Sequence, residues 1–428
     1  MMRVLLLGPA HDGGSLPPYL DVLTTALRQQ GATVTRLGST QIPYDTTTGR
    51  FWPAPQLRAA AAELTRQIDP AAHDVIALHA GNLEYDQIVP ALLPAGLGLP
   101  VVHHIHTLAP TLLHEHSPDP DLQAAVDDAT RRAAGHVWFG TYARHHQPQQ
   151  PAQPEQGRVE GAVQAGVVAW LPSTIPPGTQ AHAGTALAAA LDTDRPVVSL
   201  SGYAAPWKDP ALLLDALAQT RTPVRAVLAG PGWDDPAQAG VDLTGYAVPR
   251  PVGRHAELVV VPGYLDPGAR LALVTASTAA AFPYRPHPSF QGSGAIADYL
   301  AHHVPVVATD TANFTELIGP AGTTTPPEDP ARFAAGIDHV LTDPRPAAAA
   351  RQRAPRFTAA AHAARCLTAY RAARATAGDR PGHAPVDAAA AGASAPVVRR
   401  PAPGRRPRSR PCRSRRRTAR GRAAVAHR

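Results

Sequence analysis

The sequence predicts an α/β protein with two doubly wound Rossmann-like domains that face a central cleft, followed by a disordered C-terminal tail. Short apolar runs alternate with helical patterns along most of the 428 residues, and runs that are apolar on both faces are typical of parallel sheets covered by helices on both sides. A break rich in Pro and Gly over residues 172–195 separates two such series and predicts a linker. We therefore expect two sheets of similar design.

In the first half, helices are expected where apolar residues recur every three or four positions, over residues 16–27 and 57–68. Between and after them, short apolar runs predict strands at Val4–Leu7, Val34–Leu37, Val75–Leu78, Val101–Ile105, Val137–Phe139 and Val167–Leu171. The second series predicts strands at Val197–Leu200, Val227–Ala229, Leu258–Val261, Ala279–Phe282 and Val306–Ala308, and a last helix over 355–374.

These elements predict four parts along the chain. Residues 1–178 and residues 179–345 each form a domain built on one of the two sheets. Residues 346–375 form C-terminal helices, of which the last packs back towards the first domain. Residues 376–428 form a tail of Ala, Pro and Arg, a composition that cannot build a core.

Composition excludes several classes of protein. The net charge of +7 comes from the tail, because residues 391–428 hold 13 arginines and no acidic residue, which leaves −6 on the first 390 residues. A mildly acidic body argues against a nucleic-acid-binding domain. Two cysteines with no metal-ligand spacing fit a reducing cytoplasm. No apolar run approaches the ~20 residues of a membrane-spanning helix.

Lys208 is the one lysine in the chain, against 39 arginines. It stands in a glycine-containing turn, Gly202–Lys208, between a predicted strand and the apolar run 211–214. Backbone N–H groups and a helix N-terminus after such a turn favour an anion, and a compact ammonium balances its charge. The alternative is an ordinary exposed lysine.

Two further turns precede predicted helices and could accept an anion. Gly13 and Gly14 follow the first strand, where a plain strand-to-helix turn is the alternative. Ser293 and Gly294 open the helix that carries Asp298. Asp298 lies one turn into that helix, where it could accept hydrogen bonds from vicinal hydroxyls or serve as a solvated first-turn acid.

Three histidines follow one another on the strand 101–105 and its end. His104 and His106 share one face, and His103 points to the other. A metal site on His104 and His106 lacks a third ligand at useful spacing, so we expect none. His106, the last of them, is best placed to face the cleft, and a satisfied polar residue at a strand end is the alternative reading.

Taken together, these segments resemble the family 4 glycosyltransferases, which have the two-domain GT-B fold, transfer sugars from nucleotide diphosphates and retain the anomeric configuration. The resemblance covers about residues 1–374 and is most specific in the second half. It rests on segments similar to motifs of the family: Gly202–Leu214, Ala226–Gly232, Gly263–Leu265, Leu271–Tyr284, Asp298–Asp310, Phe314–Gly319, Gly322–Pro330 and Phe357–Tyr370.

The resemblance implies that residues 1–178 lie on the acceptor side and that residues 179–345 bind the nucleotide sugar, and it implies a role for each candidate residue. Lys208 neutralises the donor diphosphate, and Asp298 takes the ribose hydroxyls, where the family has Glu. His106 falls on the active-site histidine near the acceptor. The donor-binding set implied is Gly13, Gly14, Gly230, Tyr264, Ser293, Gly294 and Asp298. No metal or other cofactor is expected.

Two departures from the family pattern bear on activity. Ala205 and Tyr203 stand where an arginine usually precedes the lysine, and Phe290 stands where the family has a first glutamate that touches the donor sugar. Ser293 and Gly294 would then bind through backbone amides. Alternatives to a glycosyltransferase are another GT-B activity, such as a nucleotide-sugar epimerase, or a catalytically degenerate nucleotide-sugar-binding protein.

The expected partners are a nucleotide-sugar donor and a small-molecule or lipid-linked acceptor, with no specific nucleic acid. The expected location is the cytoplasm, including its membrane face, because the arginine-rich tail could attract anionic lipid.

Overall fold

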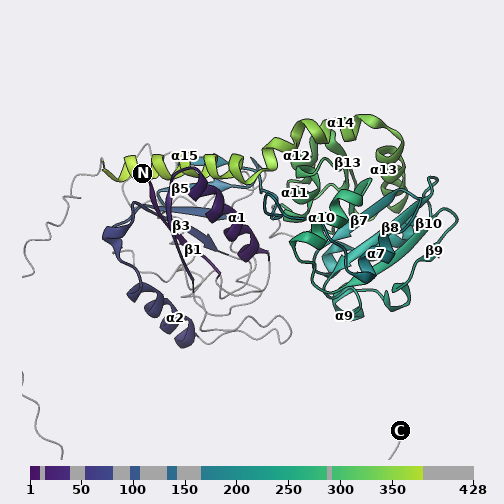
Figure 1. The fold of residues 1–428 in the computed structure, drawn as a ribbon, viewed down its shortest axis with the longest axis horizontal. Helices are drawn as coiled ribbons and strands as arrows, with labels where there is room; N and C mark the ends of the chain where they lie inside the picture. Colours follow the sequence, from purple (N-terminus) through teal and green to yellow (C-terminus); the bar gives the residue numbers. More distant parts are fainter. Residues whose placement is uncertain are drawn as a thin grey trace, which may run out of the picture. The chain divides into compact units, whose positions relative to one another are not determined.

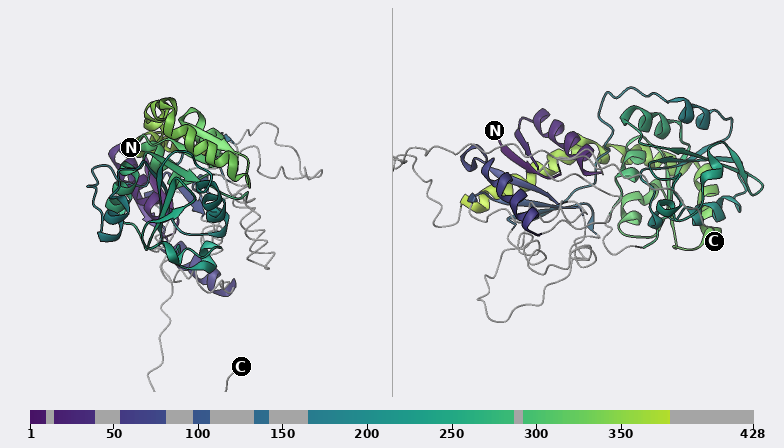
Figure 2. Two further views of the ribbon diagram at one scale, coloured as in Figure 1. Left: turned by 90° about the vertical axis from the view of Figure 1, so that its right-hand side faces the viewer. Right: turned by 90° about the horizontal axis from the view of Figure 1, so that it is seen from below.

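The protein is described by a computed structural model over residues 1–9, 15–38, 54–80, 97–106, 133–141, 165–286 and 292–378. These residues build two sheets, each covered by helices (Figure 1). The same layers are seen from two further directions in Figure 2.

The first sheet has six parallel strands in the order β2-β1-β3-β4-β5-β6. In the register, Leu5 lies opposite Thr35 on one side and Ile76 on the other. The strands are β1 (Arg3–Leu7), β2 (Thr33–Leu37), β3 (Val75–Ala80), β4 (Val101–Ile105), β5 (Gly135–Trp138) and β6 (Ala165–Val168). The helices that pack on it are α1 (Leu16–Gln29), α2 (Ala54–Arg66) and α15 (Ala359–Gly378).

Alternate residues of β1 serve the two faces of this sheet. Leu5 and Leu7 are buried against α2, whereas Val4 and Leu6 are buried against α1 and α15. Figure 1 shows α1 and α15 along one face and α2 on the other. This is why β1 reads as a continuous apolar run: both faces of a parallel sheet are covered.

The second sheet has seven strands in the order β13-β12-β11-β7-β8-β10-β9, and the edge strand β9 alone is antiparallel. The strands are β7 (Val197–Ser201), β8 (Val224–Gly230), β9 (Arg250–Val252), β10 (Ala256–Pro262), β11 (Ala279–Phe282), β12 (Val306–Thr309) and β13 (Gly322–Thr325). The α-helices of this part are α7 (Thr185–Leu191), α8 (Pro210–Leu217), α9 (Pro236–Ala239), α10 (Pro267–Ala276), α11 (Gly294–Ala301), α12 (Phe314–Ile318), α13 (Pro330–Thr342) and α14 (Pro344–Arg353). Short 3-10 turns are η1 (Pro70–Ala72), η3 (Pro206–Lys208), η4 (Thr244–Tyr246), η5 (Gly319–Ala321) and η6 (Ala354–Phe357).

The predicted fold class is confirmed, and the structure corrects several elements. The proline-rich segment 172–195 is not all linker, because α7 lies within it and buries Leu187 and Ala190 against the second sheet. The edge strands β9 and β13 were not predicted, since each is short and lacks a run of large apolar residues. The last helix runs to Gly378, beyond the predicted end. The predicted start of the tail at residue 376 is therefore wrong, because residues 376–378 belong to α15. The rest of the predicted tail, 379–428, lies outside the described residues, and the other domain boundaries stay predictions.

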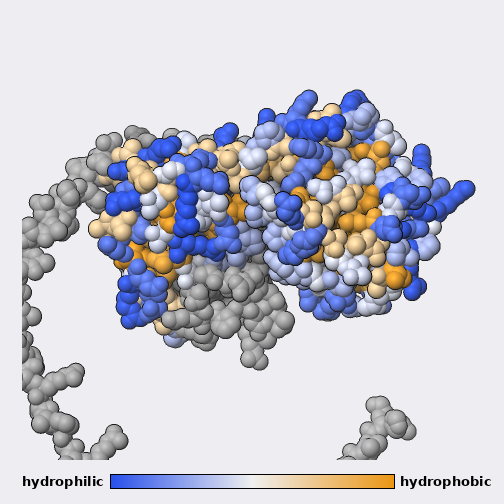
Figure 3. Space-filling model, in the orientation of Figure 1, coloured by the Kyte–Doolittle hydropathy of each residue, from blue (hydrophilic) through white to orange (hydrophobic). Residues whose placement is uncertain are grey.

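Among the described helices, none is long and apolar enough to cross a membrane. The face drawn in Figure 3 mixes hydrophilic and hydrophobic residues over both sheets.

Candidate functional site

Lys208 lies at the end of the turn that follows β7, the strand between β11 and β8 in the second sheet. Its side chain is buried, with 8% of the residue exposed, which rejects the reading as an ordinary exposed lysine. The ammonium donates to the Ser201 carbonyl at 3.4 Å. It lies 5.9 Å from the centre of the Trp233 ring and 6.0 Å from that of Tyr284.

The charge of Lys208 has no carboxylate partner among the residues that the structure describes. Burial lowers its pKa from 10.5 to about 7. Burying a cation without an anionic partner costs free energy, so binding of an anion next to Lys208 is favourable.

Two glycines shape the backbone around this cation. A side chain at Gly202 would come within 2.8 Å of the Lys208 Nζ, and one at Gly230 within 2.1 Å of the Gly202 carbonyl oxygen. Both have positive φ, 107° and 143°. The Gly202 oxygen accepts from the Trp233 indole at 3.0 Å. Gly230 therefore allows the ends of β7 and β8 to meet; its predicted contact with the donor stays a prediction.

An arginine that sequence reasoning missed lies beside the lysine turn. Arg285 follows β11, and its backbone N–H donates to the Trp207 carbonyl at 2.7 Å. Its guanidinium pairs with both oxygens of the buried Asp209, at 2.9 and 3.0 Å. Asp209 in turn caps α8 by accepting from the Leu212 N–H. The signal available in the sequence was the position of Arg285 directly after Pro283-Tyr284.

Among the residues that the structure describes, none covers the N-terminus of α11 in front of Gly294. A side chain there would meet no described atom within 4 Å. Ser293 is the N-cap, and its hydroxyl accepts from the Ile296 N–H at 3.4 Å. Because the first N–H groups of a helix have no acceptor within the helix, this end can bind an anion or a polar oxygen.

Asp298 lies deeper than the sequence suggested. Only 3% of the residue is exposed, so the alternative reading as a solvated first-turn acid is wrong. Its Oδ1 accepts from the Ser173 hydroxyl at 2.8 Å and from the Thr174 N–H at 2.7 Å, and its Oδ2 pairs with Arg270 at 3.3 Å. Burial raises the pKa of the carboxyl, against the opposing effect of Arg270.

The carboxylate of Asp298 thus ties α11 to the segment that joins the two sheets. Arg270 closes the network by donating to the Thr174 hydroxyl at 2.6 Å and to its carbonyl at 3.1 Å. Ribose hydroxyls would compete with these partners. The predicted ribose contact stays a prediction, and the structure adds a structural role that the sequence did not indicate.

Exposed aromatic rings lie on the loops that follow β7 and β10, the strands on either side of β8. Tyr203 and Trp207 are each 39% exposed in the loop after β7, and Tyr264 is 58% exposed after β10. Such rings can stack on a nucleobase. Of these three residues, the resemblance to the family had implied only Tyr264 as part of the donor site.

In the first sheet, His106 follows β4 and is half-buried. Its Nε2 lies 3.1 Å from the Nδ1 of His79, at the end of β3. Rings of Tyr19 and Phe139 pack on it, with centres at 4.9 and 4.6 Å. Burial, and then the nearby His362 and His103, lower the pKa of His106 well below its usual value. His106 is therefore neutral at neutral pH.

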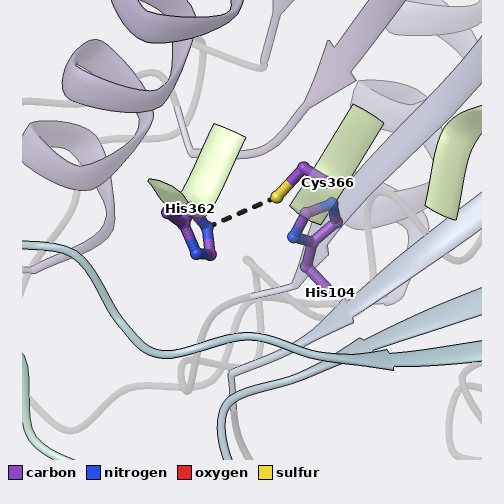
Figure 4. Close-up of side chains that lie close together, drawn as sticks. All are labelled: His104, His362 and Cys366. Carbon is purple, nitrogen blue, oxygen red and sulfur yellow. Dashed lines mark hydrogen bonds between the residues drawn. The ribbon is translucent and has the colours of Figure 1, made fainter. Parts of the chain in front are cut away.

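His104 faces the same side of β4 as His106, as predicted: their rings are nearly parallel, at 17°. Behind it, His362 and Cys366 project from α15 (Figure 4). The ligand atoms of these three residues lie within 4.8 Å of one another, the one such group of His, Cys and acidic residues in the described part of the chain. Local spacing in the sequence could not indicate His362 and Cys366, because both lie more than 250 positions after His104.

The geometry of this cluster is that of a neutral hydrogen-bond network. His104 Nε2 lies 2.9 Å from the Tyr370 hydroxyl, and His362 Nε2 lies 2.8 Å from the Tyr19 hydroxyl and 3.5 Å from the Cys366 sulfur. Tetrahedral zinc would need its ligand atoms about 3.3–3.8 Å apart. Burial raises the pKa of the Cys366 thiol, which opposes the thiolate form that a metal needs.

Two sets of predicted residues cannot be placed. Gly13 and Gly14 lie outside the described residues, and so does Phe290. Of the predicted donor-side residues, Lys208 and Gly230 lie at adjoining strand ends, and Ser293, Gly294 and Asp298 share α11.

Comparison with known proteins gives a family match for the part of the chain that contains Lys208. Residues 194–343 match the family described as "Glycosyl transferases group 1". No curated protein matches the chain.

Solved structures share the fold over most of the chain. Sucrose-phosphate synthase from Thermosynechococcus elongatus is 16% identical, with a TM-score of 0.61 over 88% of this chain and 100% of that one. HepE from Anabaena, solved with UDP-glucose, is 18% identical, with a TM-score of 0.58 over 86% and 100%. AviGT4, a glycosyltransferase of avilamycin A biosynthesis, is 17% identical, with a TM-score of 0.54 over 88% and 99%.

Proposed function

We propose that the protein transfers a sugar from a nucleotide diphosphate donor to an acceptor, because residues 194–343 match the group 1 glycosyl transferases and the chain has a GT-B fold. The transfer is proposed to retain the anomeric configuration and to need no metal. The donor binds mainly to residues 196–345 and the acceptor to residues 1–172.

The observation that carries the proposal is the buried Lys208. An ammonium held in a glycine turn, without a carboxylate partner in the described residues and with a pKa lowered to about 7, suits a ligand that brings negative charge. A diphosphate is such a ligand, and further charge develops on it as the sugar leaves. Lys208 stabilises that charge without a cation in solution.

The rest of the donor site is proposed around this point. Exposed rings of Tyr203, Trp207 and Tyr264 are available to the base. The open N-terminus of α11 at Ser293 and Gly294 offers backbone N–H groups to the sugar or phosphate, which suits a chain that has Phe290 in place of the family's glutamate. That HepE was solved with UDP-glucose makes a uridine nucleotide the first donor to test.

On the acceptor side, His106 is proposed to orient an oxygen of the acceptor or the sugar. It is the half-buried histidine at the end of β4, and its neutral ring can offer one donor and one acceptor. The acceptor is a small molecule or a lipid-linked sugar.

The test measures donor consumption with and without acceptor. Nucleotide sugars are first screened by thermal shift, since a bound donor stabilises the fold. Consumption that requires acceptor supports transfer; consumption without it points to an epimerase or hydrolase, and binding without consumption points to a degenerate binder. Lys208→Ala should lower the rate by ~30- to 1000-fold, the equivalent of roughly 2–4 kcal/mol. A wild-type rate in that variant would remove Lys208 from the site.

A further inference from the structure

His79 is a buried histidine behind the proposed active-site residue, and nothing in the sequence motifs singled it out. It is fully buried at the end of β3, opposite His104 in the register of β3 and β4. Its ring stacks on that of His104 with centres 3.9 Å apart. Its Nδ1 lies 3.1 Å from the Nε2 of His106, the next residue on that face.

One proton lies between these two nitrogens, and two arrangements are possible. Either His79 donates from Nδ1, or His106 donates from Nε2. Both rings are neutral, since burial and the neighbouring histidines lower both pKa values well below their usual range. Each ring therefore carries one N–H. Whichever ring donates at this contact has a bare nitrogen at its other position, and the ring that accepts has its N–H there.

The far nitrogen of His79 decides between them. His79 Nε2 is buried and has no hydrogen-bond partner among the described residues. If His106 donated, His79 would bury an unpaired N–H on Nε2. Buried N–H groups without an acceptor are rare in proteins, so the arrangement in which His79 Nδ1 donates is favoured.

We propose that His79 is a positioning residue that holds His106 in the tautomer protonated on Nδ1. His106 Nε2 is then occupied as an acceptor, and its remaining polar group is an N–H. His106 thus meets the substrate as a hydrogen-bond donor to a sugar or acceptor oxygen, and it does not act as a base. This rests on the proposed function, in which His106 faces the substrate.

The first test is independent of activity. In unliganded full-length protein labelled with ¹⁵N-histidine, long-range proton–nitrogen correlation spectra at pH 7.5 distinguish protonated from bare ring nitrogens. Signals are assigned with His79→Asn and His106→Gln. We expect His106 to carry its proton on Nδ1 and His79 on Nδ1. A proton on Nε2 of His106 would overturn the proposal, whatever the kinetics.

The second test uses the proposed reaction. His79→Leu removes the donor and should lower kcat at least about tenfold with less effect on donor KM. His79→Asn, whose amide nitrogen lies near the place of the imidazole Nδ1, should recover most of that loss. His103→Leu removes a buried histidine from the other face of β4 and serves as the matched control.

These outcomes separate the two proposals. The expected tautomer together with wild-type kcat in His106→Gln would refute the role of His106 in transfer and, with it, the functional part of this inference. A kcat for His79→Asn as low as that of His79→Leu, with melting temperatures equal to wild type, would show that the donated hydrogen bond has no role in turnover.

Discussion

Donor affinity should depend on pH through Lys208, because the free protein holds this amine with a pKa of about 7. A bound diphosphate favours the charged ammonium, so the pKa in the complex rises well above that value. Binding then takes up a proton whenever the free amine is neutral, which is the case above pH 7. The affinity for the donor should therefore be highest below pH 7 and should decrease as the pH rises above 7.

The magnitude follows from the titration. If the pKa of the complex lies above 9, the apparent Kd for a nucleotide sugar should rise about 15-fold between pH 7 and pH 8.5, which equals about 1.6 kcal/mol. The experiment should use a nucleotide sugar as the ligand in place of a free nucleoside diphosphate, because the phosphates of a nucleotide sugar do not titrate between pH 7 and pH 8.5.

Calorimetry checks both the affinity and the proton. Titrations in buffers of different ionisation enthalpy should report uptake of about half a proton at pH 7 and about one at pH 8.5. The control is Lys208→Arg, whose guanidinium stays charged; its affinity should be weaker at pH 7 but flat with pH. A wild-type Kd that is constant from pH 7 to 8.5, with no proton uptake, would refute the placement of Lys208 against the diphosphate.

Three other expectations concern stability, metals and the tail. Asp298→Asn leaves Arg270 without its carboxylate partner. The variant should lose about 3–5 kcal/mol of unfolding free energy in urea and should bind the donor more weakly. Unchanged stability would contradict the structural role of Asp298, and unchanged affinity for the free nucleoside diphosphate would contradict its ribose role. Turnover should survive EDTA; a loss restored by Mg²⁺ or Mn²⁺ would show a metal-dependent reaction, and one restored by Zn²⁺ would point to His104, His362 and Cys366. Truncation after Gly378 should leave the melting temperature and the rate on soluble acceptors unchanged, and full-length protein, unlike the truncated form, should sediment with anionic vesicles at low salt.

The sequence by itself determined the fold class and the central strands. Both faces of each sheet are covered, so β1 contains an unbroken apolar run at residues 4–7 and β8 contains one at residues 226–229, which inspection of the sequence can detect. Lys208 could be selected from composition alone, since it is the one lysine of the chain, and its place between a strand and a helix indicated an anion. Edge strands β9 and β13 carry no such run and were missed.

Only the tertiary structure decided which side chains meet. His79 and His106 come together because β3 and β4 are neighbours, and α15 brings His362 and Cys366 to His104 across the length of the chain. Asp298 has the same helical position that the sequence predicts, but the segment at Ser173 and Thr174 covers it and engages its carboxylate. Burial and hydrogen-bond partners arise from contacts between distant segments. A local pattern can therefore select a residue, while its environment, and with it the pKa of Lys208 and the tautomer of His106, depends on the packed structure.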